Sequence, residues 1–183
     1  TWVVTGWIGG THIAGSTEAI TKAQQSSLHY FQRPDIDYVT LDPTATSLNG
    51  WAGRVYLNKQ KGNLVFNTAL GAMSPGFHAM DMGYHARGDK INAHIEAGYQ
   101  SFHPGRVFRN WRVTLATYQS YDFGGIRTDE YYILSATARF LNYWSTNFYW
   151  SYDPTRYSHY FTRGCPRALY PCGIIRRLSL RCH

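Results

Sequence analysis

Residues 128–152 contain two consecutive runs in which apolar and polar side chains alternate, and this pattern constrains the fold most. In the first run, Tyr132, Leu134 and Phe140 fall on one face of a strand, with Ser135 and Arg139 on the other. A second alternating run begins directly after residues 141–143, which is the length of a hairpin turn. The pattern predicts an antiparallel hairpin with one apolar face.

The same alternation recurs elsewhere in the chain. In the clearest case, 91–99, every second side chain is apolar, and His94 and Glu96 lie among the polar positions. Further alternating segments are found at 2–13, 51–58, 64–72 and 110–118. We therefore expect an all-β antiparallel fold of about seven to eight strands, in a single domain over residues 1–183.

Composition indicates where such a sheet would reside. Charged residues are 16% of the chain, against roughly 25% in an ordinary soluble domain. Strands with one apolar face rich in aromatics and one hydroxyl-rich face suit a wall between lipid and a wet lumen. No apolar run approaches the ~18 residues of a spanning helix, so a membrane assignment requires a barrel. The predicted fold is a partial, up-and-down transmembrane β-barrel.

The expected connections alternate between short and longer ones. Residues 59–62, 101–106 and 141–143 form short turns, and longer connections lie at 14–48, 74–88, 121–127 and 153–172. Bacterial outer-membrane barrels place short turns on the periplasmic side and long loops outside. This predicts a location in the bacterial outer membrane, with 14–48 as a long external loop. Because the chain begins at Thr1 without a signal peptide, we expect a fragment.

The alternation assigns side chains to the two sides of the wall. Predicted lumen-facing residues are Arg54, His94, Glu96, Arg112 and Arg139. Predicted lipid-facing or interfacial aromatics are Trp51, Trp111, Trp144, Phe148 and Trp150. Inward-facing arginines favour anions, unless they pair with acids and only brace the wall.

Catalytic and cofactor chemistry is not indicated. Asp122, Asp129 and Glu130 are the nearest approach to a glycosidase carboxylate pair. A loop turn for Asp122 and a solvated strand end for the other two explain them better. His94 and Glu96 lack a third metal ligand, so a lumen hydrogen-bond network is expected instead. We therefore assign no catalytic, cofactor-binding or metal-binding residues and expect no enzyme.

The net charge of +7 raises the question of nucleic acid, but the basic residues are scattered and no recognition motif is present. The expected partners are outer-membrane lipid and, through the aromatic residues, glycans. Cys165, Cys172 and Cys182 cannot all pair internally because their number is odd. A loop joining Cys165 and Cys172 is one open pairing.

Six motifs resemble the barrel domain of one family. They are LNKQKGN at 57–63, SPGF at 74–77 followed by MDMGYHARGD, PGRVFRNWR at 104–112, DFGGIRTDEYY at 122–132, FLNYWSTNF at 140–148 and TRGCPRALYP at 162–171. Over residues 45–172 the chain is similar to the domain of unknown function 5916 family. The resemblance implies an outer-membrane barrel that follows a module like the family 9 carbohydrate-binding modules. It implies no catalytic residues.

The sequence departs from that family in three respects. The amino-terminal binding module is absent, and the family's Arg-Gly-Gly-Pro reads RGCP at 163–166. The tail GIIRRLSLRCH at 173–183 fits the family poorly and predicts an altered end. Two other functions remain open: a soluble β-sandwich that binds carbohydrate, and a segment of a TonB-dependent importer barrel.

Overall fold

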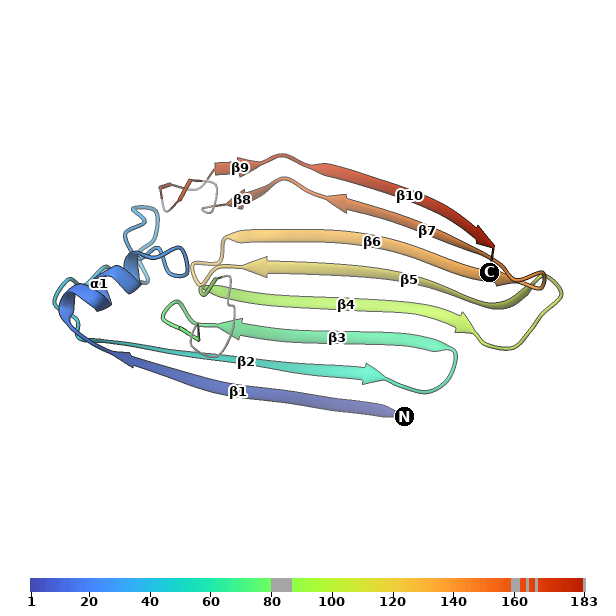
Figure 1. Cartoon of the computed structure of the whole chain (residues 1–183), viewed down its shortest axis with the longest axis horizontal. Helices are drawn as coiled ribbons and strands as arrows, with labels where there is room; N and C mark the ends of the chain where they lie inside the picture. The colour runs from blue at the N-terminus through green and yellow to red at the C-terminus, as the bar shows by residue number, and fades with distance from the viewer. Residues whose placement is uncertain (80–86, 159–161, 164, 167, 183) are drawn as a thin grey trace.

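The computed structural model describes residues 1–79, 87–158, 162–163, 165–166 and 168–182. Most of these residues belong to one antiparallel sheet of eight strands, in the order β1-β2-β3-β4-β5-β6-β7-β10 (Figure 1). The strands are β1 (Trp2–Ala14), β2 (Ser47–Lys59), β3 (Leu64–Met73), β4 (Lys90–Ser101), β5 (Phe108–Tyr121), β6 (Arg127–Phe140), β7 (Trp144–Asp153) and β10 (Gly173–Cys182). The remaining elements are the helix α1 (Thr17–Gln25) and a small ribbon of β8 (Arg156–Ser158) with β9 (Ala168–Tyr170).

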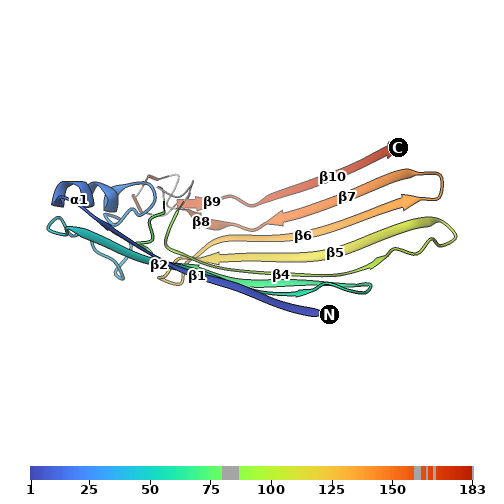
Figure 2. The ribbon, with the colours of Figure 1, turned by 60° about the horizontal axis from the view of Figure 1, so that its bottom comes forward.

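The sheet is open. The strands β1 and β10 form its two edges and do not pair with each other, so the sheet is not closed into a barrel. Figure 2 shows these two strands at opposite margins of a single layer. The predicted all-β antiparallel class is therefore confirmed, and the described part of the chain has the form of an unclosed wall.

The short turns all lie at one end of the sheet. They connect β2 to β3, β4 to β5 and β6 to β7, on the right in Figure 1. Two of them contain a residue with positive φ, Gly62 at 95° and Tyr143 at 67°, as reversals of chain direction often require. The opposite end has α1, the connections from β1 to β2, from β3 to β4 and from β7 to β10, and the five-residue connection from β5 to β6. We call these the turn end and the loop end.

The connection 15–46 is more ordered than expected from its sequence. The Ser16 hydroxyl accepts a hydrogen bond from the Ala19 amide at 3.2 Å and caps α1. One face of this helix buries Ile20, which packs with Phe31 and Leu48 in a small apolar cluster. Among the described residues, no helix combines the length and the apolar character needed to cross a bilayer.

The carboxyl-terminal tail forms an edge strand of the sheet. Residues 173–182 form the regular strand β10, which pairs with β7 from Gly173↔Asp153 to Cys182↔Trp144. Its side chains continue the alternation, because Ile174 and Leu178 lie opposite the apolar positions Tyr152 and Phe148. This tail therefore completes the eighth strand that the sequence predicted only in part. His183 lies outside the described residues.

Candidate functional site on the polar face of the sheet

The register places all five predicted lumen-facing residues on one face. Directly opposed residues of an antiparallel pair share a face. One row across six strands therefore consists of Trp7, Arg54, Gly71, Asn92, Ser120 and Asp129. His94, Glu96, Arg112 and Arg139 lie in rows that are progressively nearer the turn end. We call this side the polar face.

Arg54 and His94 together link three strands of the polar face. Its Nη1 donates to Asn92 Oδ1 at 3.2 Å, and its Nη2 donates to His94 Nδ1 at 2.9 Å. A guanidinium has no acceptor, so His94 Nδ1 must accept, and its proton lies on Nε2. That Nε2 donates to Asn67 Oδ1. These contacts fix one neutral tautomer of His94, as expected for a hydrogen-bond network.

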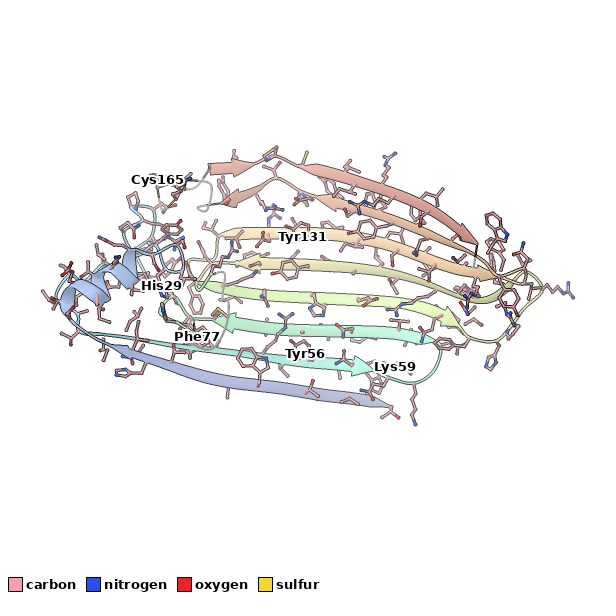
Figure 3. All side chains as sticks on the ribbon, viewed as in Figure 1. His29, Tyr56, Lys59, Phe77, Tyr131 and Cys165 are labelled. Atoms are coloured by element: carbon pink, nitrogen blue, oxygen red, sulfur yellow. The ribbon has the colours of Figure 1, made fainter. Side chains whose placement is uncertain are left out.

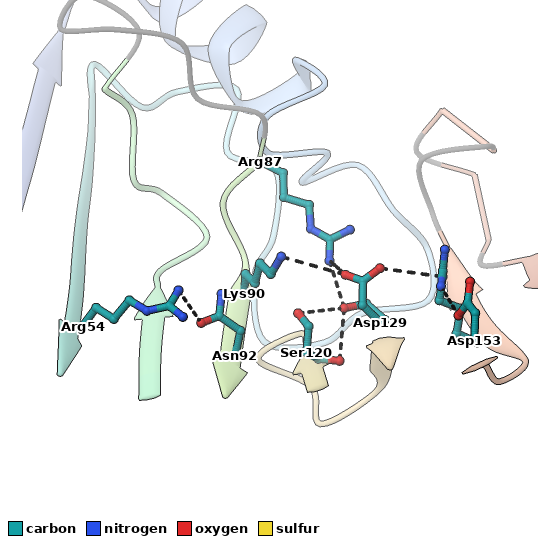
Figure 4. Close-up of polar contacts among 9 residues, drawn as sticks. Arg54, Arg87, Lys90, Asn92, Ser120, Asp129 and Asp153 are labelled. Atoms are coloured by element: carbon teal, nitrogen blue, oxygen red, sulfur yellow. Dashed lines mark hydrogen bonds and ion pairs between the residues drawn. The ribbon is translucent and has the colours of Figure 1, made fainter. Parts of the chain in front are cut away.

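The link depends on Gly71, which lies between Arg54 and Asn92 in the same row. A Cβ at this position would come within 3.1 Å of both Arg54 Cγ and Asn92 Oδ1. Absence of a side chain on β3 is what allows an arginine of β2 to reach an asparagine of β4. Figure 4 shows this contact.

Glu96 and Arg112 form a separate pair on the polar face. Arg112 Nη2 lies 2.6 Å from Glu96 Oε1, and both side chains are partly exposed. Within the described ranges no ion pair reaches Arg139, which lines a shallow depression near the turn end with Asn110 and Ser145. No group of three His, Cys, Asp or Glu side chains could hold a metal ion in the part of the chain described.

Asp129 is the centre of a cluster that the sequence did not reveal. Its carboxylate lies 3.0 Å from Arg87, 3.9 Å from Lys90 and 3.6 Å from Arg156 (Figure 4). Arg156 also pairs with Asp153. The expectation of a solvated strand end is therefore wrong for Asp129. Strand alternation gave no sign of this cluster, because Arg87 and Arg156 come from connections outside the large sheet.

Glu130 also differs from the expected solvated end. It is only 4% exposed. Its carboxylate accepts hydrogen bonds from Gln119 Nε2 at 3.0 Å and Tyr132 Oη at 2.7 Å, and it pairs with Arg127 at 2.5 Å. Asp122 caps its own loop by accepting from the Ile126 amide at 2.9 Å. All three carboxylates thus have structural partners.

The predicted lipid-facing aromatics share the other side of the sheet, which we call the apolar face. Leu70, Ile95 and Leu115 lie on this face and are 56%, 49% and 59% exposed. The register adds the five aromatics Trp51, Trp111, Trp144, Phe148 and Trp150 to the same side. Scattered exposed apolar residues are ordinary, but one continuous face of them marks an interaction surface.

The loop end is held by a buried charge cluster. Arg33 Nη2 lies 2.5 Å from Asp89 Oδ2, which also accepts from Tyr38 Oη at 2.7 Å. Burial, together with the hydrogen bond to Asp89, raises the pKa of the Tyr38 phenol. Burial lowers the pKa of Arg33, but its interactions with Asp89 and Tyr38 outweigh this, so the net pKa is raised. The cluster fastens the connection 15–46 to the start of β4. His29, labelled at the loop end in Figure 3, lies with its Nδ1 2.7 Å from the Pro75 carbonyl oxygen.

The cysteine pairing is partly settled. Cys165 and Cys172 are both free and exposed, so the loop between them is not closed by a disulfide. The side chain of Cys182 and the residue Gly164 of the RGCP sequence lie outside what the structure describes.

Comparison with known proteins identifies a family but no function. No curated protein and no solved structure matches the chain. One family model, the domain of unknown function DUF5916, matches residues 9–170, which include seven of the eight large-sheet strands wholly or in part. The chain therefore belongs to the DUF5916 family.

Proposed function

We propose that this chain forms part of the wall of a bacterial outer-membrane β-barrel, with its apolar face toward lipid and its polar face toward an aqueous lumen. The observation that carries the proposal is the uncovered apolar face. Few apolar side chains are buried among the described residues, and those of the packed cluster lie at the loop end. The exposed apolar area would cost roughly 25 cal/mol for each Å² kept in water.

Strand length supports the same proposal. The eight strands of the sheet contain 10 to 14 residues. A tilted strand needs about 9 to 11 residues to cross the hydrocarbon layer. The three connections at the turn end have at most six residues, and three of the four at the loop end are longer, which also matches outer-membrane barrels.

The polar face suits a wet lumen. Its Arg54, His94 and Asn67 contacts satisfy polar groups within the face, and the Arg112 and Glu96 pair leaves both partners accessible to water. Such side chains would be unfavourable against lipid. On this proposal the two free edges, β1 and β10, pair with other strands to close the barrel.

A soluble β-sandwich has less support. A sandwich needs a second sheet across the apolar face. In the described ranges, the only strands outside the large sheet are β8 and β9, with 3 residues each. The importer segment and the link to glycans stay predictions.

Reconstitution tests the proposal. The chain is refolded with vesicles of bacterial polar lipids, washed with alkaline carbonate and floated on a density gradient. The proposal expects the chain to stay with the vesicles and to show β-sheet circular dichroism there. A monodisperse, water-soluble monomer with a cooperative melt, which carbonate strips from the vesicles, would support the sandwich instead.

A further inference from the structure

The polar face contains a small pocket rich in positive charge. It has a volume of about 80 Å³ and is lined by Trp7, Gly53, Arg54, Gly71, Ala72, Met73, Arg87, Lys90 and Asn92. Three of these residues are cations and none is an acid. At about 30 Å³ for each water in the liquid, the space accepts two or three waters or a group of similar size.

Of the three cations in this pocket, Arg54 forms no ion pair with a carboxylate among the described residues. Its hydrogen bonds go to the neutral groups of Asn92 and His94. Its Nε is buried and has no hydrogen-bond partner among the described residues. A buried donor of this kind calls for a water or an ion.

The other two cations share one carboxylate. Arg87 and Lys90 both pair with Asp129, which Arg156 also contacts. Arg156 also pairs with a second described acid, Asp153. Among the described ion pairs, three cations therefore share Asp129, whereas Arg54 has no ion pair with a carboxylate. Figure 4 shows Arg54, Lys90 and Arg87 within one region of the face.

We propose that this pocket binds a small oxyanion, such as phosphate, sulfate or a carboxylate, with Arg54 as the principal ligand residue. The separate oxygens of an oxyanion can accept paired, charge-assisted hydrogen bonds from the N–H groups of a guanidinium. A chloride ion is a single atom and cannot form such a pair of parallel bonds. The apolar walls, Trp7 and Met73, lower the local dielectric and strengthen these bonds. This inference deepens the proposed function and rests on it, because solutes reach the pocket from the lumen that the polar face is proposed to line.

Calorimetric titration of the whole chain in detergent, with sodium phosphate, acetate and chloride, tests the site without a bilayer. We expect phosphate to bind at least tenfold more tightly than chloride. Arg54→Gln should weaken phosphate binding at least tenfold, and Lys90→Gln should weaken it less. Arg139→Gln is the matched control, because it removes an arginine of the same face outside the pocket, and it should leave binding unchanged.

Circular dichroism of each variant confirms that the sheet is retained, and Lys90→Gln provides the test if Arg54→Gln does not fold. No binding by the unmodified chain, equal affinity for chloride, equal weakening by Arg139→Gln, or full binding by both pocket variants would overturn the proposal. A chain that binds phosphate but fails to enter vesicles would contradict only the membrane function.

Discussion

Arg54 passes over Gly71 so closely that a Cβ on the glycine would lie 3.1 Å from the Arg54 Cγ. The same Cβ would lie 3.3 Å from the carbonyl oxygen of Gly53, which belongs to the backbone and cannot easily move. The contact between β2 and β4 over the polar face therefore depends on this one residue.

We expect Gly71→Ala to displace Arg54 from Asn92 and His94 and to cost about 1 to 3 kcal/mol, the range for overpacking. Gly9→Ala is the control, since Gly9 lies on the same face and a Cβ there meets nothing within 4 Å. It should be neutral or stabilising by up to about 1 kcal/mol. Chemical denaturation in detergent measures the change in the free energy of unfolding for each variant. Equal changes for Gly71→Ala and Gly9→Ala would contradict the close contact.

The strands could be predicted because apolar and polar residues alternate along a strand that has one apolar and one polar face. His94 and Glu96, two apart, had to share a face, and the register confirms that they do. The pocket around Arg54 could not be predicted, because it depends on which strands are neighbours. Nothing in the sequence shows that Gly71 separates Arg54 from Asn92, or that Arg87 reaches Asp129 from a loop.

The helix α1 was missed for a different reason. Its signal, Ser16 before a nine-residue segment with Ile20 and Gln24 on one face, is short. Alternation of every second residue does not indicate a helix, in which the residues of one face recur every three to four positions. An eighth strand was predicted only in part, because the tail 173–183 fits the family poorly, although the alternation of β10 is regular.

The buried pair at the loop end provides a second prediction. Asp89→Asn leaves the fully buried Arg33 guanidinium without its counter-charge, and breaking such a pair typically costs about 3 to 5 kcal/mol. We expect residues 26–46 to become sensitive to limited proteolysis. Asp37→Asn, an exposed acid of the same connection, is the control and should leave the digestion pattern unchanged.

The Tyr38 phenol gives the same region a pH dependence. Its pKa is raised in the folded chain, first by burial and then by the bond to Asp89. The stabilising contribution is therefore complete below the ordinary tyrosine pKa, about 10, and is lost as the pH rises through the higher folded value. The difference in absorbance at 295 nm between the unmodified chain and Tyr38→Phe should show a phenol that ionises above pH 10. A difference titration centred at the ordinary value would contradict this.

The free edges predict self-association. The strands β1 and β10 each present unpaired backbone groups. In a background with all three cysteines replaced by serine, Thr5→Cys on β1 combined with Ser179→Cys on β10 should form covalent oligomers in detergent. Thr5→Cys with Ser151→Cys is the control, because Ser151 lies on the interior strand β7 and is buried. Equal cross-linking in both would argue against pairing at the edges.

The central claim, that the apolar face meets lipid and the polar face water, is tested most directly by one pair of substitutions. Ala97 on β4 lies on the apolar face opposite Leu115, and Ala116 on β5 lies on the polar face opposite Glu96. Membrane insertion of Ala97→Arg and Ala116→Arg is measured by flotation with lipid vesicles after a carbonate wash. The account predicts that Ala97→Arg loses insertion, by about 2 to 4 kcal/mol if the site is near the midplane, while Ala116→Arg inserts like the unmodified chain. Equal insertion of the two variants, or a greater loss for Ala116→Arg, would contradict it.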